Sequence, residues 1–463
     1  MEEIVKMRFT ISICLVICLI IPSIAQESSM KKELSNEEKI YGLSLLWKEA
    51  SYNFAHFDHI PDLDWNKTYQ EFIPKVLSTK STEECYKVLK QFYALLNHYH
   101  TLVFPPQEIR ENYDEPKIKV LNIQRQAIIA DVGVSLKDYI PIGSQIIQID
   151  DVPINIYLKN NKFPYISHST EDFLWEIGII ELLKGEKSTN VNITYVTPKN
   201  KTKEITLVRN SKDIEEKWFR SDNKKQRFKF KWLENDIVYM ALNTFNDKRI
   251  LSDFKEKLTE LHNCKGLIID LRNNGGGDSD IGYGILKHLI EKPIQTYTWK
   301  TRENISVYKA WGRWTSELST EALKNISEKR KEYLKHYNGI AFYEGKSDTI
   351  YPVSDNKVIV PMVILTGNTG SAAEDFLVAM DSIERAVFVG KTTAGCTGTP
   401  FMFDLPGGGM AMVTTTIQMY PNGRKNRNGI NPDIEVQPTV QDIIENKNPV
   451  LEKGISILNE KIK

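Results

Sequence analysis

A serine at the boundary between an apolar strand and a helical segment is the first candidate nucleophile in this sequence. Residues 364–374 read Ile-Leu-Thr-Gly-Asn-Thr-Gly-Ser-Ala-Ala-Glu, so a glycine-rich turn leads into a helix that starts at Ser371. Free amides and the positive end of the helix dipole would stabilise an alkoxide or a tetrahedral anion there. Ser371 and Glu374 also have the spacing of a helix capping box. Taken alone, these residues favour the structural cap.

Three consecutive glycines form a second candidate element. The segment Asp270-Leu-Arg-Asn-Asn-Gly-Gly-Gly277 directly follows an apolar strand. Glycines cost conformational entropy on folding, which indicates that the main chain must stay unobstructed there. Their amides could donate hydrogen bonds to a developing oxyanion, and each such donor contributes about 3 to 4 kcal/mol to transition-state stabilisation. A plain glycine-rich turn explains the same residues equally well.

Two histidines at the end of a helical segment are candidates for a general base. They lie in the sequence Asn97-His-Tyr-His-Thr101. An exposed helix end or a His-x-His metal pair are the alternatives, but ligands two positions apart diverge on a helix, so we expect no metal and no cofactor. Gly390-Lys-Thr392 is similar to part of a phosphate loop, but Arg385 stands where that motif requires glycine.

The first elements that must position these groups are predicted to be a helical cap and a β module. Apolar residues recur at helical spacing over Glu37–Phe54 and Thr82–Asn97, which predicts a helical cap domain at 30–115. Short strands separated by turns predict a β module at 117–212, including strands at 145–149, 191–195 and 204–208. Its segment 140–154 is similar to the strand-turn-strand of a PDZ domain, which binds a peptide as an added strand. Any small β module is the alternative.

The remaining chain predicts an α/β core at 216–445, because apolar runs typical of strands alternate with helical stretches. The predicted strands are Ile237–Leu242, Gly266–Leu271, Val358–Leu365 and Ala386–Val389. A charged, aromatic-rich insertion at 296–355 is either a lid or a solvated segment, helical in part. A helical tail follows at 446–463.

The N-terminus has the features of a secretory signal peptide at 1–25. Lys6 and Arg8 precede an apolar run at 9–21, and Ser23 and Ala25 approximate a small-x-small cleavage pattern. This predicts export to the periplasm or the extracellular space, with membrane contact only in transit through the signal peptide. A retained anchor, or a lipoprotein attached through Cys18, is the alternative. No disulfide framework emerges from the remaining cysteines, Cys85, Cys264 and Cys396.

Composition excludes some partners. Lys plus Arg and Asp plus Glu number 60 each among 463 residues, so the formal net charge is zero and nucleic acid is a poor partner. A chain of this length predicts two or three packed units, and 41% hydrophobic residues is ordinary for globular chains. No periodic pattern indicates an oligomeric state.

The order of these pieces along the chain resembles the tail-specific, C-terminal-processing and tricorn-core serine peptidases. The resemblance covers nearly the whole mature chain and rests on Leu46-Trp47, Tyr52–Phe54, Asp64-Trp65, His100-Thr101, the PDZ-like unit, Asp270–Gly277, Ser371–Glu374 and Gly429–Asp433. It implies a multidomain α/β fold with a crotonase-like spiral of ββα units as the core. Ser371 would be the acylated nucleophile, and Gly276 or Gly275 with the amide of Ala372 would form the oxyanion hole.

The same resemblance bears on the base. In the processing branch a lysine lies twenty-five residues after the nucleophile, and Cys396 occupies that position here. The chain is therefore similar to the tricorn and retinoid-binding branch, whose histidine matches His100. Departures are Tyr99, where the tricorn enzyme has a supporting serine, and Asn426, where many relatives have glutamate. Glu374 is a candidate to support His100, and Lys391 is a weaker substitute base.

The resemblance implies an exported serine peptidase that acts on polypeptide substrates, in unfolded or C-terminal segments, through a Ser acyl-enzyme with a His base. A non-catalytic peptide- or lipid-binding protein on the same scaffold is the alternative, supported by the missing lysine and the unassigned partner of His100. A lid-bearing interaction protein, whose aromatic stretch docks a partner, is a third hypothesis.

Overall fold

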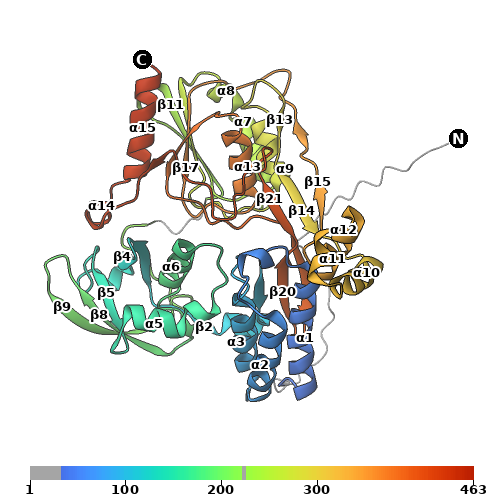
Figure 1. The fold of residues 1–463 in the computed structure, drawn as a ribbon. Coiled ribbons are helices and arrows are strands. Elements are labelled where there is room, and N and C mark those ends of the chain that lie inside the picture. The colour runs from blue at the N-terminus through green and yellow to red at the C-terminus, as the bar shows by residue number, and fades with distance from the viewer. Residues whose placement is uncertain (1–32, 222–225) are drawn as a thin grey trace, which may run out of the picture. The chain divides into compact units, whose positions relative to one another are not determined.

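The computed structural model of the chain describes residues 33–221 and 226–463, and these residues form a mixed α/β structure (Figure 1). The predicted signal peptide lies outside the described residues. Within the two described ranges, no helix combines the length and apolar character that a membrane crossing requires.

The N-terminal helices pack on strands from the far end of the chain. Helices α1 (Asn36–Asn53), α2 (Trp65–Leu77) and α3 (Thr82–Ala94) begin at side-chain caps on Ser35, Asp64 and Ser81. The strand β1 (Leu102–Phe104) pairs with β20 (Gly409–Thr414), which pairs with β19 (Pro400–Leu405). One apolar cluster joins the helices to this sheet, so the sequence-distant strands complete the core of the predicted cap (Figure 1).

The β module contains a six-stranded antiparallel sheet, which confirms the strands predicted there. The strands are β3 (Ile118–Ile123), β4 (Gln126–Val132), β5 (Gln145–Ile149), β6 (Val152–Pro153), β8 (Asn190–Val196) and β9 (Thr202–Val208). Helix α6 (Glu171–Ile180) packs on β3, which is an edge strand, and α5 (Ile154–Asn161) packs near β5. Short elements α4 (Gln107–Glu111), β2 (Tyr113–Asp114) and β7 (Gly185–Glu186) flank the module.

The core is built on a second six-stranded sheet with the order β10-β11-β12-β17-β18-β22. Its strands are β10 (Phe228–Trp232), β11 (Ile237–Leu242), β12 (Gly266–Asp270), β17 (Met362–Thr366), β18 (Val387–Gly390) and β22 (Ile434–Glu435), all parallel except β10. The strand predicted from Val358 begins only at Met362. Pro361 lacks an N–H for a sheet ladder, and the Arg385 guanidinium binds the carbonyls of Val358 and Val360.

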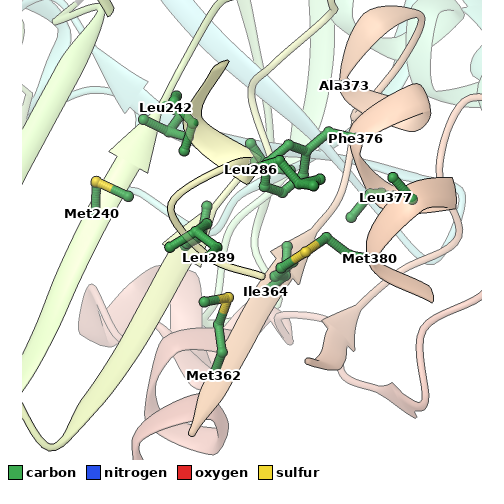
Figure 2. Packing of buried hydrophobic residues seen from close by; sticks show 14 of the residues in the cluster. Met240, Leu242, Leu286, Leu289, Met362, Ile364, Ala373, Phe376, Leu377 and Met380 are labelled. Atoms are coloured by element: carbon green, nitrogen blue, oxygen red, sulfur yellow. The ribbon is translucent and has the colours of Figure 1, made fainter. Parts of the chain in front are cut away.

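Helices cover both faces of this sheet, as a parallel sheet requires. Helices α7 (Arg249–Glu256), α8 (Leu258–Leu261), α9 (Ser279–Leu286) and α13 (Ala372–Asp381) contribute to one apolar cluster. Figure 2 shows Phe376 and Met380 of α13 packed with Leu286 and Ile364. Alternate strand residues such as Val363 face the C-terminal helix α15 (Pro449–Lys461), which follows α14 (Val440–Glu445).

The insertion at 296–355 is helical in part, as predicted. It contains β14 (Thr298–Arg302), α10 (Ser306–Ser316), α11 (Thr320–Lys324), α12 (Glu328–Tyr337) and β15 (Phe342–Gly345), and β13 (Ile294–Gln295) pairs with β16 (Thr349–Ile350). Strand β14 pairs with β15 and with β21 (Thr416–Met419) of the core. The mixed α/β fold is thus confirmed, whereas the crotonase-like spiral and the PDZ identity of the β module stay predictions.

Candidate active site

Ser371 lies in a sharp turn between β17 and α13. The strand ends at Thr366, the helix begins at Ala372, and Ser371 itself adopts φ 55° and ψ −129°. A positive φ is uncommon for a residue with a β-carbon and marks local strain. The turn therefore places a strained serine after a parallel strand and at the start of a helix, and the strand-turn-helix order is the one that the sequence predicted.

The glycine loop after β12 packs directly against this turn. A β-carbon placed on Gly276, which has φ +97°, would lie 2.5 Å from the Ser371 β-carbon and 2.8 Å from the Ala372 nitrogen. At Gly275, an added β-carbon would meet no atom within 4 Å. Close approach to the nucleophile turn thus explains the glycine at 276, whereas open space surrounds 275.

The amides of the loop differ in availability. The Gly276 amide, one of the three amides considered as oxyanion donors, donates to Oδ1 of Asn274 at 2.9 Å. The amides of Gly275 and Ala372 donate to no acceptor within the described ranges. Of the two glycine amides that the sequence offered for an oxyanion hole, the one of Gly276 therefore has a partner, and the one of Gly275, like that of Ala372, is free to donate.

His100 lies in the turn between α3 and β1, and its ring is held by a main-chain carbonyl. Its Nδ1 lies 2.8 Å from the Gly398 carbonyl oxygen, so Nδ1 carries the proton and donates it to that carbonyl. In the neutral ring, Nε2 then has the free lone pair. Burial lowers the pKa of His100, which keeps the ring neutral at physiological pH. Sequence reasoning missed Gly398 because a carbonyl acceptor has no side-chain signature.

Glu374 is fully buried and binds the loop that leads to Gly398 rather than His100. Its carboxylate accepts four hydrogen bonds, from the Ser371 amide, the Thr393 hydroxyl and the amides of Gly395 and Cys396. Burial raises the pKa of Glu374 to about 7, against the effect of these donors. The carboxylate therefore connects the Ser371 turn to residues 393–396, and none of its four hydrogen bonds comes from His100.

Lys391, the weaker candidate base, and Cys396, at the position of the processing-branch lysine, both have partners of their own. The Lys391 ammonium donates to the Glu176 carboxylate of α6 at 2.9 Å, which engages this alternative base in an ion pair. Burial and the Glu374 charge hold the pKa of the Cys396 thiol well above its usual value. The thiol is therefore protonated and packs on Gly370, where a β-carbon would lie 2.4 Å from its sulfur.

One group of three metal-type ligands occurs within the described ranges, and it lies in the insertion. It consists of Glu303, Glu332 and His336. Nδ1 of His336 accepts the Ile305 amide hydrogen at 3.4 Å, so the ring proton lies on Nε2, the atom that faces the carboxylates. This tautomer does not suit a metal at Nε2.

A cavity of about 510 Å³ lies between the β module and the core. Its walls include residues 121–125 at β3 and its turn, Phe173 and Glu176 of α6, and core residues 366–368 and 391–394. The Glu176 carboxylate also accepts a hydrogen bond from Asn368 Nδ2 at 2.8 Å. The cavity is thus lined by an edge strand of the β module and by the loops that follow β17 and β18 of the core.

Comparison with known proteins adds independent findings. Residues 236–436 match the model of Peptidase family S41. A relative from Picosynechococcus sp., named carboxyl-terminal-processing protease, is 22% identical over 85% of this chain and 81% of its own length. A relative from Tetradesmus obliquus, named C-terminal processing peptidase, chloroplastic, is 23% identical over 57% of this chain and 49% of that protein. The structure of mature CPAF aligns with 92% of this chain and 97% of its own, at 16% identity and a TM-score of 0.68.

Proposed function

We propose that this chain, a serine peptidase whose residues 236–436 match the model of Peptidase family S41, hydrolyses unfolded or C-terminal protein segments through an acyl-enzyme on Ser371. The observation that carries this proposal is the contact between the strained Ser371 turn and the glycine loop at Gly276. Free amides of Gly275 and Ala372 belong to these two touching segments. Nucleophile and oxyanion donors therefore come from one packed unit.

His100 is the general base in this proposal. Its Nε2 accepts the Ser371 hydroxyl proton as the seryl oxygen attacks the carbonyl carbon. The resulting imidazolium gives that proton to the leaving amine, and the acyl-enzyme forms. A water molecule then loses a proton to the same nitrogen and releases the acyl group. The hydrogen bond from Nδ1 to the Gly398 carbonyl holds the ring in the required tautomer and stabilises the imidazolium.

The oxyanion hole in this proposal uses the amides of Gly275 and Ala372. Both are free to donate, whereas the Gly276 amide is bound to Asn274. Amides fixed before the reaction stabilise the tetrahedral anion without a reorganisation cost. The role of Gly276 is steric. Because it has no β-carbon, the glycine loop can approach the Ser371 turn.

The β module at 117–212 would present the substrate to the core at 216–445. Strand β3 lies at one edge of its sheet, and an extended peptide can pair with such an edge. The 510 Å³ cavity beside β3 and α6 extends to core residues 391–394. A tail bound at β3 would thus continue towards Ser371. The predicted signal peptide supports action after export, in the periplasm or outside the cell.

A fluorophosphonate probe and denatured casein test this function. Fluorophosphonate reacts with an activated serine, so we expect labelling of the native protein and fragmentation of casein. Both should be lost in Ser371→Ala and reduced at least about a thousandfold in His100→Gln. Folded protein that shows neither Ser371-dependent labelling nor cleavage would contradict the proposal.

A further inference from the structure

The main-chain amides of Tyr99, His100 and Thr101, in the turn that contains His100, donate to three different acceptors. The Tyr99 amide donates to Ser169 Oγ at 3.3 Å, and the Thr101 amide donates to the His98 carbonyl oxygen at 3.0 Å. The His100 amide donates to Nδ1 of the His98 ring at 3.1 Å. The main chain of the proposed base is therefore held by a second histidine, two residues earlier.

This hydrogen bond determines the state of His98. Its Nδ1 accepts a hydrogen, so that nitrogen is unprotonated and the ring proton lies on Nε2. Burial holds the pKa of His98 well below its usual value, and His56, His100, Arg427 and His59 act in the same direction. The neutral ring is thus retained, because a proton on Nδ1 would face the His100 amide hydrogen.

Neighbouring rings hold His98 in place. His98 is fully buried and stacks on the His56 ring, with centroids 4.6 Å apart and an angle of 24° between the planes. The edge of Phe54 contacts the ring at a centroid distance of 6.3 Å. A buried ring with these contacts keeps one rotamer, so Nδ1 remains directed at the His100 amide.

The two ends of His100 are therefore anchored separately. His98 holds its main-chain amide at 3.1 Å, and the Gly398 carbonyl holds Nδ1 of its ring at 2.8 Å. We propose that His98 is a positioning residue for this peptidase: its Nδ1 holds the main chain of His100 so that Nε2 can reach Ser371. This inference rests on the proposed function, in which His100 is the base.

The test separates the acceptor at position 98 from the volume of its side chain. His98→Leu keeps a buried side chain of similar size but has no acceptor, so the His100 amide loses its partner. Asparagine commonly accepts the amide two residues ahead, so His98→Asn restores an acceptor. We expect the rate of fluorophosphonate labelling at pH 8 to fall about tenfold in His98→Leu, and to stay within about threefold of the native rate in His98→Asn.

Three controls make the result decisive. His56→Phe removes the neighbouring imidazole but keeps an aromatic partner, and it should label at the native rate. Melting temperatures identify folded variants, and His98→Met replaces His98→Leu if the latter does not fold. Equal rates in native protein and the folded Leu or Met variant would overturn the role of His98, as would an Asn variant no faster than Leu. Absence of Ser371-dependent labelling in native protein would instead overturn the proposed function, and this inference with it.

Discussion

Gly276 and Ser371 lie so close that a β-carbon on the glycine would sit 2.5 Å from the β-carbon of the serine. The next two nearest atoms are main chain, the Gly370 oxygen at 2.7 Å and the Ala372 nitrogen at 2.8 Å, so none of the three is the far end of a flexible side chain. The glycine loop and the Ser371 turn can therefore approach this closely only because residue 276 has no side chain.

Substitution at this contact should separate activity from folding. Gly276→Ala forces the two segments apart and strains a residue at φ +97°, so fluorophosphonate labelling should fall at least about a hundredfold. Gly275→Ala is the matched control for stability, because its β-carbon meets nothing within 4 Å. Thermal unfolding should show a lower melting temperature for Gly276→Ala and an unchanged one for Gly275→Ala. Native-like labelling of Gly276→Ala would contradict this account of the site.

The decrease of the fluorophosphonate labelling rate at acidic pH should follow the protonation of Glu374. Only the ionised carboxylate can accept all four of its hydrogen bonds, and burial raises the pKa of Glu374 to about 7. The labelling rate should therefore fall as the pH drops through about 7. In Glu374→Gln the fall should move to the lower pH at which His100 protonates, because burial lowers the pKa of His100 below 6.5. If the labelling rate of Glu374→Gln fell at the same pH as that of the native protein, a group other than Glu374 would control this pH dependence.

Asp375 offers a prediction on stability. Burial raises its pKa from 3.8 to about 7, so the folded protein holds this proton more tightly than the unfolded chain. The stability that this difference contributes is present below the unfolded pKa and is lost as the pH rises through about 7. Asp375→Asn keeps an oxygen acceptor for the Ser279 hydroxyl but cannot ionise. Its free energy of unfolding should exceed that of native protein by about 4 kcal/mol at pH 8.

Urea unfolding of both proteins between pH 4 and pH 8 measures this gap. The difference in the free energy of unfolding between Asp375→Asn and native protein should be smallest at pH 4. It should grow with pH until the Asp375 carboxyl is ionised in the folded state. A gap that is independent of pH would show that Asp375 does not titrate in this range. In Asp375→Asn the fluorophosphonate labelling rate should still fall at the same acidic pH as in native protein. This result would distinguish Asp375 from its neighbour Glu374.

Cys396 should be unreactive in the native protein, although it occupies the position of a lysine in the processing branch. The thiol is buried and its pKa is raised, and burial also raises the pKa of Cys85 and Cys264 to about 11. Alkylation requires the thiolate, so iodoacetamide at pH 8 should leave these three thiols unmodified until the protein is unfolded. Mass spectrometry detects the modification. Rapid native alkylation at Cys396 would indicate an accessible thiolate beside the nucleophile.

Local patterns in the sequence were sufficient for many elements. The strands at 237–242 and 145–149 coincide with the prediction, and the strand-turn-helix at Ser371 has the expected form, because periodicity and glycine placement act over a few neighbouring residues. The strand predicted from Val358 was too long because Pro361 interrupts the ladder, a local signal that the apolar run outweighed. The order of motifs also indicated the peptidase family, which the match at 236–436 supports.

The hydrogen-bond and ion-pair partners of the candidate site residues could not be predicted from local sequence patterns. The acceptor for His100 is the carbonyl of Gly398, 298 positions away in the sequence, and every residue has such a carbonyl. The choice between Gly275 and Gly276 depends on which amide Asn274 occupies, and Lys391 is engaged because α6 brings Glu176 to it. Residue types therefore indicated which side chains can react, because a nucleophile or a base is recognised by its residue type. Long-range packing assigned each group its partner, since main-chain acceptors and ion pairs between distant elements leave no trace in local sequence.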